Sequence, residues 1–393
     1  MKNIDNMENS LLIKNVLLDG ERRNILVRDG RFVCLDAAPG AEAARTIEAD
    51  GLGILPAFYN THTHAAMTLM RGYGDDRPLH EWLEEWVWPY EDKLGAGDIR
   101  HGSEIAIKEM ISTGTVFFND MYFDIDETME LVEAAGMRAA IGVTLMDNHP
   151  KVLRDEKAAR VRSWKDSSRL LLTVAPHSVY TASRDTLLEA AKLARENGRR
   201  IHIHVSETTK EVQDCIAATG MTPVRYLDSL GLLGPDVIAA HCVHVDKEEW
   251  DILAERGVTV SHCPCSNMKL GSGRFPYELA LASGARITLG TDGCSSNNNL
   301  DMREEMKVAA LLAKVTGDAA LLSASQVLQW ATRNGAEAFG FDAGVVAEGK
   351  LADAVLVDMG NPKMTPCHNL ISNWVYSADS SCIKYVICNG NIL

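Results

Sequence analysis

The stretch GILPAFYNTHTH, residues 53–64, is a short apolar run that ends in two histidines one residue apart. Successive side chains point to opposite faces of a β-strand, so His62 and His64 share one face. Imidazole nitrogens bind Zn²⁺ at about 2.0–2.1 Å, which allows two such histidines to hold one ion. The stretch therefore predicts a buried strand whose end carries half of a metal site.

Seven further segments follow the same plan, an apolar strand that ends in polar residues, and helix-like stretches separate them. They are GTVFFNDMY (114–122), MRAAIGVTLMD (137–147), RLLLTVAPHS (169–178), RRIHIHVSE (199–207), DVIAAHCVH (236–244), GVTVSHCPCS (257–266) and ARITLGTDG (285–293). Apolar strands that alternate with helices predict a parallel sheet covered by helices, and eight such units fit an α/β fold of the (β/α)₈ TIM-barrel type. A doubly wound sheet would carry a glycine-rich phosphate turn after the first strand, where this chain has His-Thr-His.

Both ends of the chain have the pattern of short strands joined by tight turns. Segments 11–20 and 23–35 contain Asp-Gly pairs, and segments 351–359 and 383–393 include an Asn-Gly pair. Such pairs are typical of β-hairpins. We therefore expect a small β-sandwich formed from both termini, with residues 1–55 as its N-terminal part, 56–345 as the barrel and 346–393 as its C-terminal part.

Composition excludes some classes of partner. The formal net charge of the 393 residues is −15, whereas nucleic acids and anionic membranes bind basic surfaces. The nine cysteines are scattered, with Cys263 and Cys265 as the only close pair, which is typical of reduced thiols. The sequence shows neither a signal-peptide core near its start nor an apolar run of about 20 residues. We expect a cytoplasmic protein that binds no nucleic acid and no membrane.

Titratable residues gather at the ends of the predicted strands. These are His62 and His64 on the first, His177 on the fourth, His204 and Glu207 on the fifth, His241 on the sixth and Asp292 on the eighth. The carboxyl ends of barrel strands converge on one face, where active sites lie. His204 and Asp292 are the candidates to complete the metal site, and His204 is favoured over His202 because it lies nearer the end of its strand.

Each of these signals is weak by itself. A lone His-x-His pair has many explanations, and a strand-end aspartate is more often a helix cap. Their coincidence at equivalent ends of several strands favours a site for one divalent metal ion. Three imidazoles and one carboxylate suit Zn²⁺, and also Fe²⁺ or Mn²⁺.

Several motifs together resemble those of the amidohydrolase superfamily. They are THTHAAMTLMRG (61–72), PYED (89–92), APHSVY (175–180), HIHVSE (202–207), AAHCVH (239–244), SHCPCSNMKLGSG (261–273) and LGTDGCSSNNNLDM (289–302). Within the superfamily they are similar to the mononuclear-metal deaminases of the methylthioadenosine/S-adenosylhomocysteine deaminase group. The resemblance extends to EGKLADAVLVD (348–358), which marks the return to the β-sandwich. The binuclear branch carries a carboxylated lysine on the fourth strand, and segment 169–178 has no lysine, which favours a single metal.

The resemblance implies a role for each matching residue. The metal ligands would be His62, His64, His204 and Asp292. Glu207 would be the proton shuttle, and His241, with Asp292, would orient and help deprotonate the metal-bound water. Glu91 would hold the ribose 2′ and 3′ hydroxyls, and His177 would contact the nucleoside. Arg154 is the candidate for a second family arginine, whereas Val143 stands where members that accept S-adenosylhomocysteine carry an arginine.

The implied activity is hydrolytic deamination of adenosine, 5′-deoxyadenosine, methylthioadenosine or S-adenosylhomocysteine to an inosine-type product and ammonia, by a homo-oligomer. Glu207 would protonate the ring nitrogen beside the attacked carbon and then pass a proton to the departing ammonia. A valine cannot pair with a carboxylate, which favours the first three substrates. The alternatives are an amidohydrolase that deaminates or dechlorinates a free guanine, cytosine, pterin or triazine ring, and a barrel that only binds metal or purine.

Overall fold

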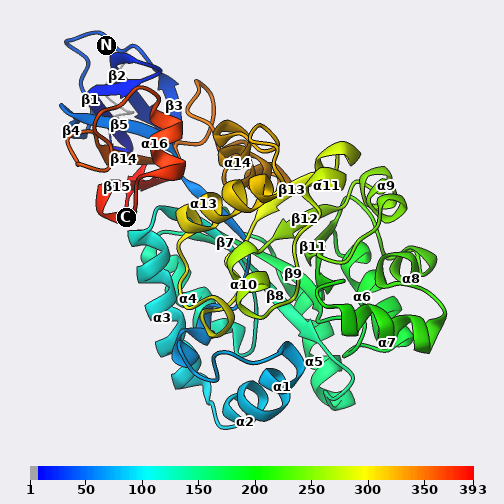
Figure 1. Ribbon diagram of the computed structural model, residues 1–393. Coiled ribbons are helices and arrows are strands. Elements are labelled where there is room, and N and C mark those ends of the chain that lie inside the picture. The colour runs from blue at the N-terminus through cyan, green and yellow to red at the C-terminus, as the bar shows by residue number, and fades with distance from the viewer. Residues whose placement is uncertain (1–7) are drawn as a thin grey trace.

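The computed structural model describes residues 8–393, and at its centre an eight-stranded parallel sheet curves into a barrel (Figure 1). Its strands lie in sequence order as β6 (Phe58–Thr63), β7 (Thr115–Tyr122), β8 (Arg138–Leu145), β9 (Leu170–Pro176), β10 (Arg200–Val205), β11 (Val237–His241), β12 (Thr259–His262) and β13 (Arg286–Leu289). Each strand falls within one of the eight predicted segments. The predicted TIM barrel is confirmed.

The first and last strands meet through side chains and backbone. The Thr61 hydroxyl on β6 lies 2.7 Å from the Thr288 hydroxyl on β13 and donates to the Leu289 carbonyl at 2.9 Å. Just beyond β13, the Asp292 N–H donates to the His62 carbonyl at 3.0 Å. These bonds bring the end of the eighth strand against the end of the first.

Helices cover the outer face of the barrel (Figure 1). They include α3 (Ala96–Ser112), α4 (Ile125–Ala135), α5 (Lys151–Ser163), α6 (Arg184–Glu196), α7 (Thr209–Thr219), α8 (Pro223–Ser229), α9 (Lys247–Glu255), α11 (Tyr277–Ser283), α13 (Met302–Ala313), α14 (Ala324–Ala331) and α15 (Arg333–Ala338). Helix α6 illustrates why they pack there. Its buried residues Leu187, Ala190, Ala191 and Ala194 recur at the spacing of one helix face, and Ser183 caps its first turn.

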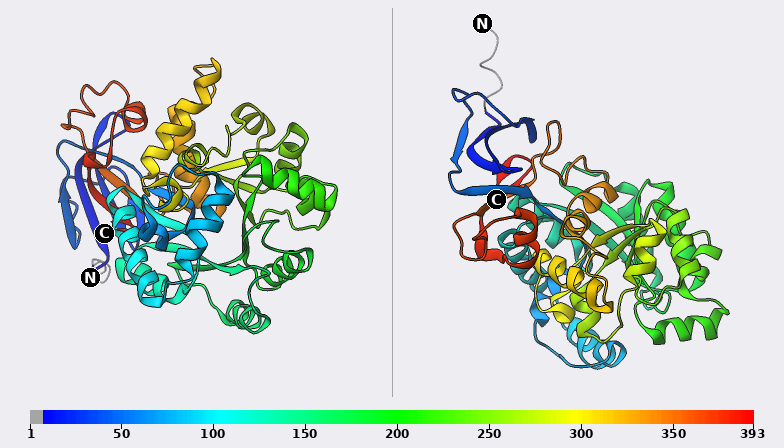
Figure 2. Two further views of the ribbon diagram at one scale, coloured as in Figure 1. Left: turned by 60° about the horizontal axis from the view of Figure 1, so that its bottom comes forward. Right: turned by 45° about the horizontal axis from the view of Figure 1, so that its top comes forward.

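The strands from the two ends of the chain form a second sheet beside the barrel, seen in both views of Figure 2. It contains β1 (Ser10–Leu18), β2 (Glu21–Arg28), β3 (Arg31–Cys34), β4 (Arg45–Glu48), β5 (Leu52–Pro56), β14 (Ala354–Asp358), β15 (Ile383–Cys388) and β16 (Asn391–Ile392). The sheet bends until its edge strand β3 meets the segment before β14, where the Phe32 N–H donates to the Lys350 carbonyl at 3.0 Å. It encloses an apolar core that includes Leu11, Ile25 and Leu356, so both termini build one small β-domain, as expected.

The opening stretch 53–64 contains two strands rather than one. Strand β5 ends at Pro56 and belongs to the terminal sheet, whereas β6 begins at Phe58 and is the first barrel strand. Only Ala57 separates them, so the chain passes from one sheet to the other within this single apolar run. The domain limits at 55/56 and 345/346 stay a prediction.

A buried ion pair joins the two sheets. Arg138 begins β8, and its Nη1 lies 2.6 Å from Asp353 Oδ2, just before β14. Tyr59 donates its hydroxyl to the same carboxylate, whose other oxygen accepts the Asn389 N–H at 2.7 Å. Both charged side chains are at most 2% exposed, so each depends on the other for its counter-charge.

Short helices after β6 cover the mouth of the barrel. These are η1 (Ala65–Met70), α1 (Leu79–Trp82), the π-helix η2 (Leu83–Val87) and α2 (Trp88–Glu91). Helix α12 (Cys294–Asn297) packs against η1 and against α10 (Pro264–Lys269), and α16 (Leu370–Tyr376) packs against α14. The nine cysteines are free thiols. Among residues 8–393, no helix has both the length and the apolar character to cross a bilayer.

Candidate metal centre and active site

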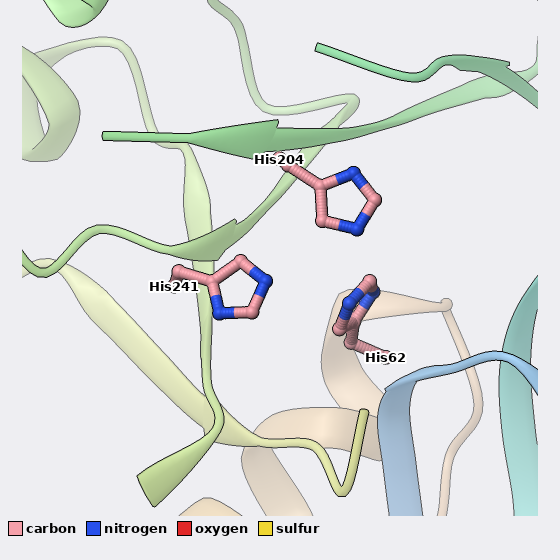
Figure 3. Close-up of side chains that lie close together, drawn as sticks. All are labelled: His62, His204 and His241. Carbon is pink, nitrogen blue, oxygen red and sulfur yellow. The ribbon is translucent and has the colours of Figure 1, made fainter. Parts of the chain in front are cut away.

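Four histidines and one aspartate converge at the carboxyl ends of four strands of the barrel. His62 lies on β6 and His64 directly follows it, His204 lies on β10, His241 ends β11 and Asp292 follows β13. Figure 3 shows the rings of His62, His204 and His241 turned toward a common space. His241 and Asp292 have φ angles of 72° and 60°, in the left-handed region that few residues other than glycine adopt.

The spacing of these side chains fits a metal ion. Asp292 Oδ1 lies 3.3 Å from His62 Nε2 and 3.2 Å from His64 Nε2, and His64 Nε2 lies 3.4 Å from His204 Nε2. Two nitrogens bound to one tetrahedral Zn²⁺ at about 2.0–2.1 Å are themselves about 3.4 Å apart. Ligand atoms of His62, His204 and His241 also lie within 4.8 Å of one another, so all five residues surround one position.

Outer hydrogen bonds orient every imidazole of this cluster through its Nδ1 atom. The Nδ1 partners are His202 Nε2 at 2.8 Å for His62, the Met121 carbonyl at 2.6 Å for His64, the His177 carbonyl at 2.8 Å for His204 and Asn267 Oδ1 at 2.8 Å for His241. When Nδ1 carries the proton and donates in this way, Nε2 has a free lone pair facing the centre.

The Asp292 carboxylate is fixed by neutral donors. Its Oδ2 accepts the Ser266 hydroxyl at 2.6 Å and the Ser296 hydroxyl at 3.0 Å, and its Oδ1 accepts the Gly293 N–H at 2.9 Å. Asp292 and its three partners are buried. On its inner side this carboxylate faces His62 and His64, so a divalent cation among these imidazoles would lie beside its negative charge.

Burial and mutual charge shift the titration of the cluster. Burial lowers the pKa of His62 to about 4 and holds that of His204 well below its usual value. Burial opposes protonation of His64 as well, but its bond to Asp292 raises that pKa to about 9. His62 Nε2 is buried and makes no hydrogen bond. A buried lone pair without a donor, facing a carboxylate, fits a metal ligand.

Glu207 lies beside the cluster, two residues beyond β10. Its Oε2 is 3.7 Å from His241 Nε2, and the Ser272 hydroxyl donates to its Oε1 at 3.2 Å. Burial raises the pKa of Glu207, which favours a carboxyl group that both donates and accepts protons near neutral pH.

A second buried carboxylate, Glu211 on α7, holds the backbone at Glu207. Its two oxygens accept the Ser206 N–H at 2.9 Å and the Glu207 N–H at 2.7 Å. Sequence reasoning missed this residue, although Thr208 and Glu211 have the spacing of a capping box. The Glu211 carboxylate instead accepts the backbone N–H groups of Ser206 and Glu207, the two residues before the N-cap. The backbone turns at Ser206, whose φ is 51°.

A cavity opens above the cluster. Its lining includes His64, His204, Glu207, His241 and Asp292, together with the predicted substrate ligands Glu91 and His177, and the short helices after β6 supply Leu79, Trp82, Leu83, Val87 and Trp88. A larger outer cavity shares Trp88, Glu91, Phe123, Met146 and Tyr180 with it. No lysine or arginine of the described chain lines either cavity.

Arg154 is the one predicted site residue that lies apart from the others. It is on α5, donates to the Thr186 hydroxyl at 3.3 Å and lines neither cavity. Val143 also lines neither of these cavities. The structure thus brings the metal, proton-shuttle and ribose candidates together and leaves Arg154 outside them.

Comparison with known proteins now places the chain. The model of the Amidohydrolase family matches residues 54–393. The chain belongs to the amidohydrolase family. Among its relatives are a 5′-deoxyadenosine deaminase of Methanosarcina mazei, 44% identical over 95% of this chain and 88% of the relative, and a 5-methylthioadenosine/S-adenosylhomocysteine deaminase of Archaeoglobus fulgidus, 43% identical over 98% and 93%.

Solved structures agree with this family membership. The crystal structure of an adenosine deaminase from Xanthomonas campestris with bound zinc is 35% identical to this amidohydrolase, with a TM-score of 0.92 over 98% of this chain and 92% of the other. The match spans both the barrel and the terminal sheet, so this amidohydrolase and that zinc-containing protein share one architecture.

Proposed function

We propose that this amidohydrolase is a metal-dependent deaminase that hydrolyses adenosine-type nucleosides to an inosine-type product and ammonia. The observation that supports this most directly is the position of Glu207 and His241 beside the histidine–aspartate cluster, at the floor of one cavity. The deaminase relatives with 43–44% identity support the same reaction.

His62, His64, His204 and Asp292 would hold one divalent metal ion, and we propose Zn²⁺. Three imidazoles with inward Nε2 atoms and one carboxylate form a donor set that this ion prefers. When bound, such an ion lowers the pKa of a water molecule to about 7 and so supplies a nucleophile at neutral pH.

Asn267 would fix which nitrogen of His241 carries the proton. The pKa of His262 is lowered to about 3 by burial, so this ring is neutral, and its Nδ1 lies 3.5 Å from Asn267 Nδ2. With that amide nitrogen turned to His262, Asn267 Oδ1 accepts the Nδ1–H of His241. His241 Nε2 then keeps its lone pair toward the cavity, where it would orient the attacking water.

Glu207 would move the protons of the reaction. As a carboxylic acid it would donate to N1 of the purine, which makes the adjacent C6 a better electrophile. The resulting carboxylate would take a proton from the water-derived oxygen now bonded to C6 and deliver it to the amino group, which departs as ammonia. Ser272 and the backbone contacts from Glu211 would keep the carboxyl at a fixed distance from His241. Asp292 would help hold the water in line with C6.

Glu91 and His177 would bind the nucleoside. Glu91 lies on the helices that cover the cavity, where its carboxylate would accept the ribose hydroxyls, and His177, just after β9, lines the same cavity. Among residues 8–393, no lysine or arginine lines either cavity, which favours adenosine, 5′-deoxyadenosine and methylthioadenosine over the carboxylate-bearing S-adenosylhomocysteine. The role of Arg154 in substrate binding stays a prediction, because Arg154 lines neither cavity.

An ammonia-release screen tests this proposal. The zinc-loaded protein would be assayed for ammonia release with adenosine, 5′-deoxyadenosine, methylthioadenosine, S-adenosylhomocysteine, guanine, cytosine and a pterin, and for chloride release with a chlorotriazine. We expect turnover of the nucleosides and at least a 100-fold lower kcat in Glu207→Gln with unchanged zinc content, because general acid–base groups contribute about 10²–10⁴-fold. Turnover of a free base alone would overturn the nucleoside assignment, and zinc binding with no turnover of any compound would indicate a binding protein.

A further inference from the structure

Glu305 is a fully buried carboxyl group that lies outside the metal cluster. It belongs to α13 and lines neither of the two cavities. Its Oε1 accepts the Asn297 side-chain N–H at 2.6 Å, and its Oε2 accepts the Cys265 backbone N–H at 3.1 Å. A buried carboxyl group is costly unless hydrogen bonds satisfy it, so these two bonds account for its place in the interior.

The bond to the Cys265 N–H ties this carboxyl group to the segment that contacts both Asp292 and His241. Cys265 lies in the first turn of α10. The next residue, Ser266, donates its hydroxyl to Asp292 Oδ2 at 2.6 Å, and Asn267 Oδ1 lies 2.8 Å from His241 Nδ1. The carboxyl group therefore holds the start of the helix that carries both contacts.

The bond to Asn297 ties the same carboxyl group to a second segment that holds Asp292. Asn297 ends α12, and the residue before it, Ser296, donates its hydroxyl to Asp292 Oδ2 at 3.0 Å. The Asn297 amide also donates to the carbonyl of Thr291, the residue before Asp292, at 2.7 Å. Both hydroxyls that fix Asp292 Oδ2 thus belong to residues next to a partner of Glu305.

The positions of these two segments decide where the other oxygen of Asp292 lies. Helix α10 has six residues and α12 has four, so neither is stable by itself and each depends on tertiary contacts. Asp292 Oδ1 lies 3.3 Å from His62 Nε2 and 3.2 Å from His64 Nε2. A shift of either helix would turn the carboxylate and move Oδ1 away from the imidazoles.

Only a carboxyl group of this size can accept from both partners of Glu305. Burial raises the pKa of Glu305 to about 8, and the bonds from Cys265 and Asn297 oppose that rise. In either protonation state both carboxyl oxygens keep acceptor capacity, whereas a glutamine has one acceptor oxygen and an amide nitrogen that only donates. Glutamine at this position would fill the same space and release one of the two segments.

We propose that Glu305 is a positioning residue of the metal centre, which joins α10 to α12 and so sets Asp292 Oδ1 for the metal ion and Asn267 for His241. This inference rests on the proposed function, because it takes the cluster to hold the metal ion of a deaminase. Glu305 lies outside both cavities, so it acts on metal affinity and kcat and leaves substrate affinity unchanged.

The first test is a Zn²⁺ titration of the metal-free protein against a competing chelator. Glu304→Gln is the matched control, because Glu304 is the neighbouring carboxylate on α13 and accepts the Asn299 amide at 2.7 Å. We expect Glu305→Gln to weaken Zn²⁺ affinity about 10-fold, as for loss of an outer partner of a ligand, and Glu304→Gln to match the wild type. In the zinc-saturated protein, Glu305→Gln should lower kcat for adenosine and leave KM unchanged.

A double-mutant cycle separates positioning from a purely structural role. In a Ser266→Ala/Ser296→Ala background the hydroxyls that connect the two helices to Asp292 are gone, so Glu305→Gln should cost much less Zn²⁺ affinity there than in the wild type. Chemical unfolding of the metal-free proteins measures any packing defect separately. Equal losses of affinity in both backgrounds, or a loss of stability with wild-type zinc affinity, would overturn the assignment.

A second variant covers the case in which Glu305→Gln does not fold. Asn297→Ala cuts one of the two bonds and leaves Glu305 paired with Cys265, and it should also weaken Zn²⁺ affinity; wild-type affinity would overturn the inference. A wild type that binds zinc but deaminates no nucleoside would overturn the proposed function, while the zinc titration still decides the role of Glu305. A wild type that deaminates nucleosides, with unchanged zinc affinity in Glu305→Gln, would overturn only this inference.

Discussion

Replacing His202 by phenylalanine should weaken metal binding, although His202 is not one of the proposed ligands. Its Nε2 lies 2.8 Å from His62 Nδ1, and both rings are fully buried. In the tautomer that frees His62 Nε2 for the metal, Nδ1 carries a proton and donates it to His202. A phenylalanine fills similar space but accepts nothing, so that N–H would be buried without a partner.

The expected magnitude follows from this lost acceptor. An unsatisfied buried donor costs about 1–3 kcal/mol, and His62 can avoid the cost by moving its proton to Nε2, which then cannot bind a metal. The penalty therefore appears mainly in the metal-bound state. Loss of such an outer partner typically lowers metal affinity about 10–100-fold, and we expect Zn²⁺ affinity in His202→Phe to fall within that range.

The assay is a zinc titration of the metal-free protein against a competing chelator. His202→Gln is the matched control, because its amide oxygen can still accept from His62, and it should lose less affinity than His202→Phe. Thermal unfolding of the metal-free proteins would measure any packing defect separately. Wild-type zinc affinity in His202→Phe would refute the claim that His202 selects the tautomer of His62.

Three further predictions concern buried charged residues, two near the site and one between the two sheets. The pKa of Glu91 is about 7 and its ionised form accepts hydroxyls, so the affinity for inosine should rise as pH rises through about 7, and Glu91→Gln should remove this dependence. Because the pKa of Glu91 is raised in the folded protein, its contribution to folding stability is present at low pH and is lost as pH rises through about 7. Glu211→Gln should lower kcat by up to about 100-fold at unchanged metal content, because a small displacement of Glu207 is costly. Glu249→Gln is the control: it also removes a buried carboxylate from a backbone N–H and should leave kcat unchanged. Equal kcat values in the two variants would contradict this prediction. Arg138→Met should cost about 3–5 kcal/mol of unfolding free energy by leaving Asp353 buried and unpaired, and a loss below about 1 kcal/mol in chemical unfolding would contradict it.

The barrel and the residues of the metal cluster were predictable from local pattern. Eight apolar segments with polar ends gave the strands β6–β13, and a period of two placed His62 and His64 on one face. The carboxyl ends of barrel strands meet at one face, so the same pattern predicted that His204 and Asp292 join them. These inferences need only the periodicity of a strand and the topology of the barrel.

The contacts that tune the cluster were not predictable in this way. Asn267 holds His241 from α10, and no spacing in the sequence connects the two. The bond between His202 and His62 depends on how β10 faces β6 across the barrel interior, which is set by side-chain packing between segments 140 residues apart. The absence of Arg154 from both cavities likewise depends on the direction of α5, which periodicity does not define.

The central claim is that one metal ion, held by His62, His64, His204 and Asp292, is required for deamination. Its most direct test is to remove metal with a chelator, return Zn²⁺ in measured steps and record ammonia release from adenosine at each step. The account predicts no activity in the metal-free protein and a linear rise that stops at one zinc per chain. Full activity in the metal-free protein, or a rise that continues to two ions per chain, would contradict it.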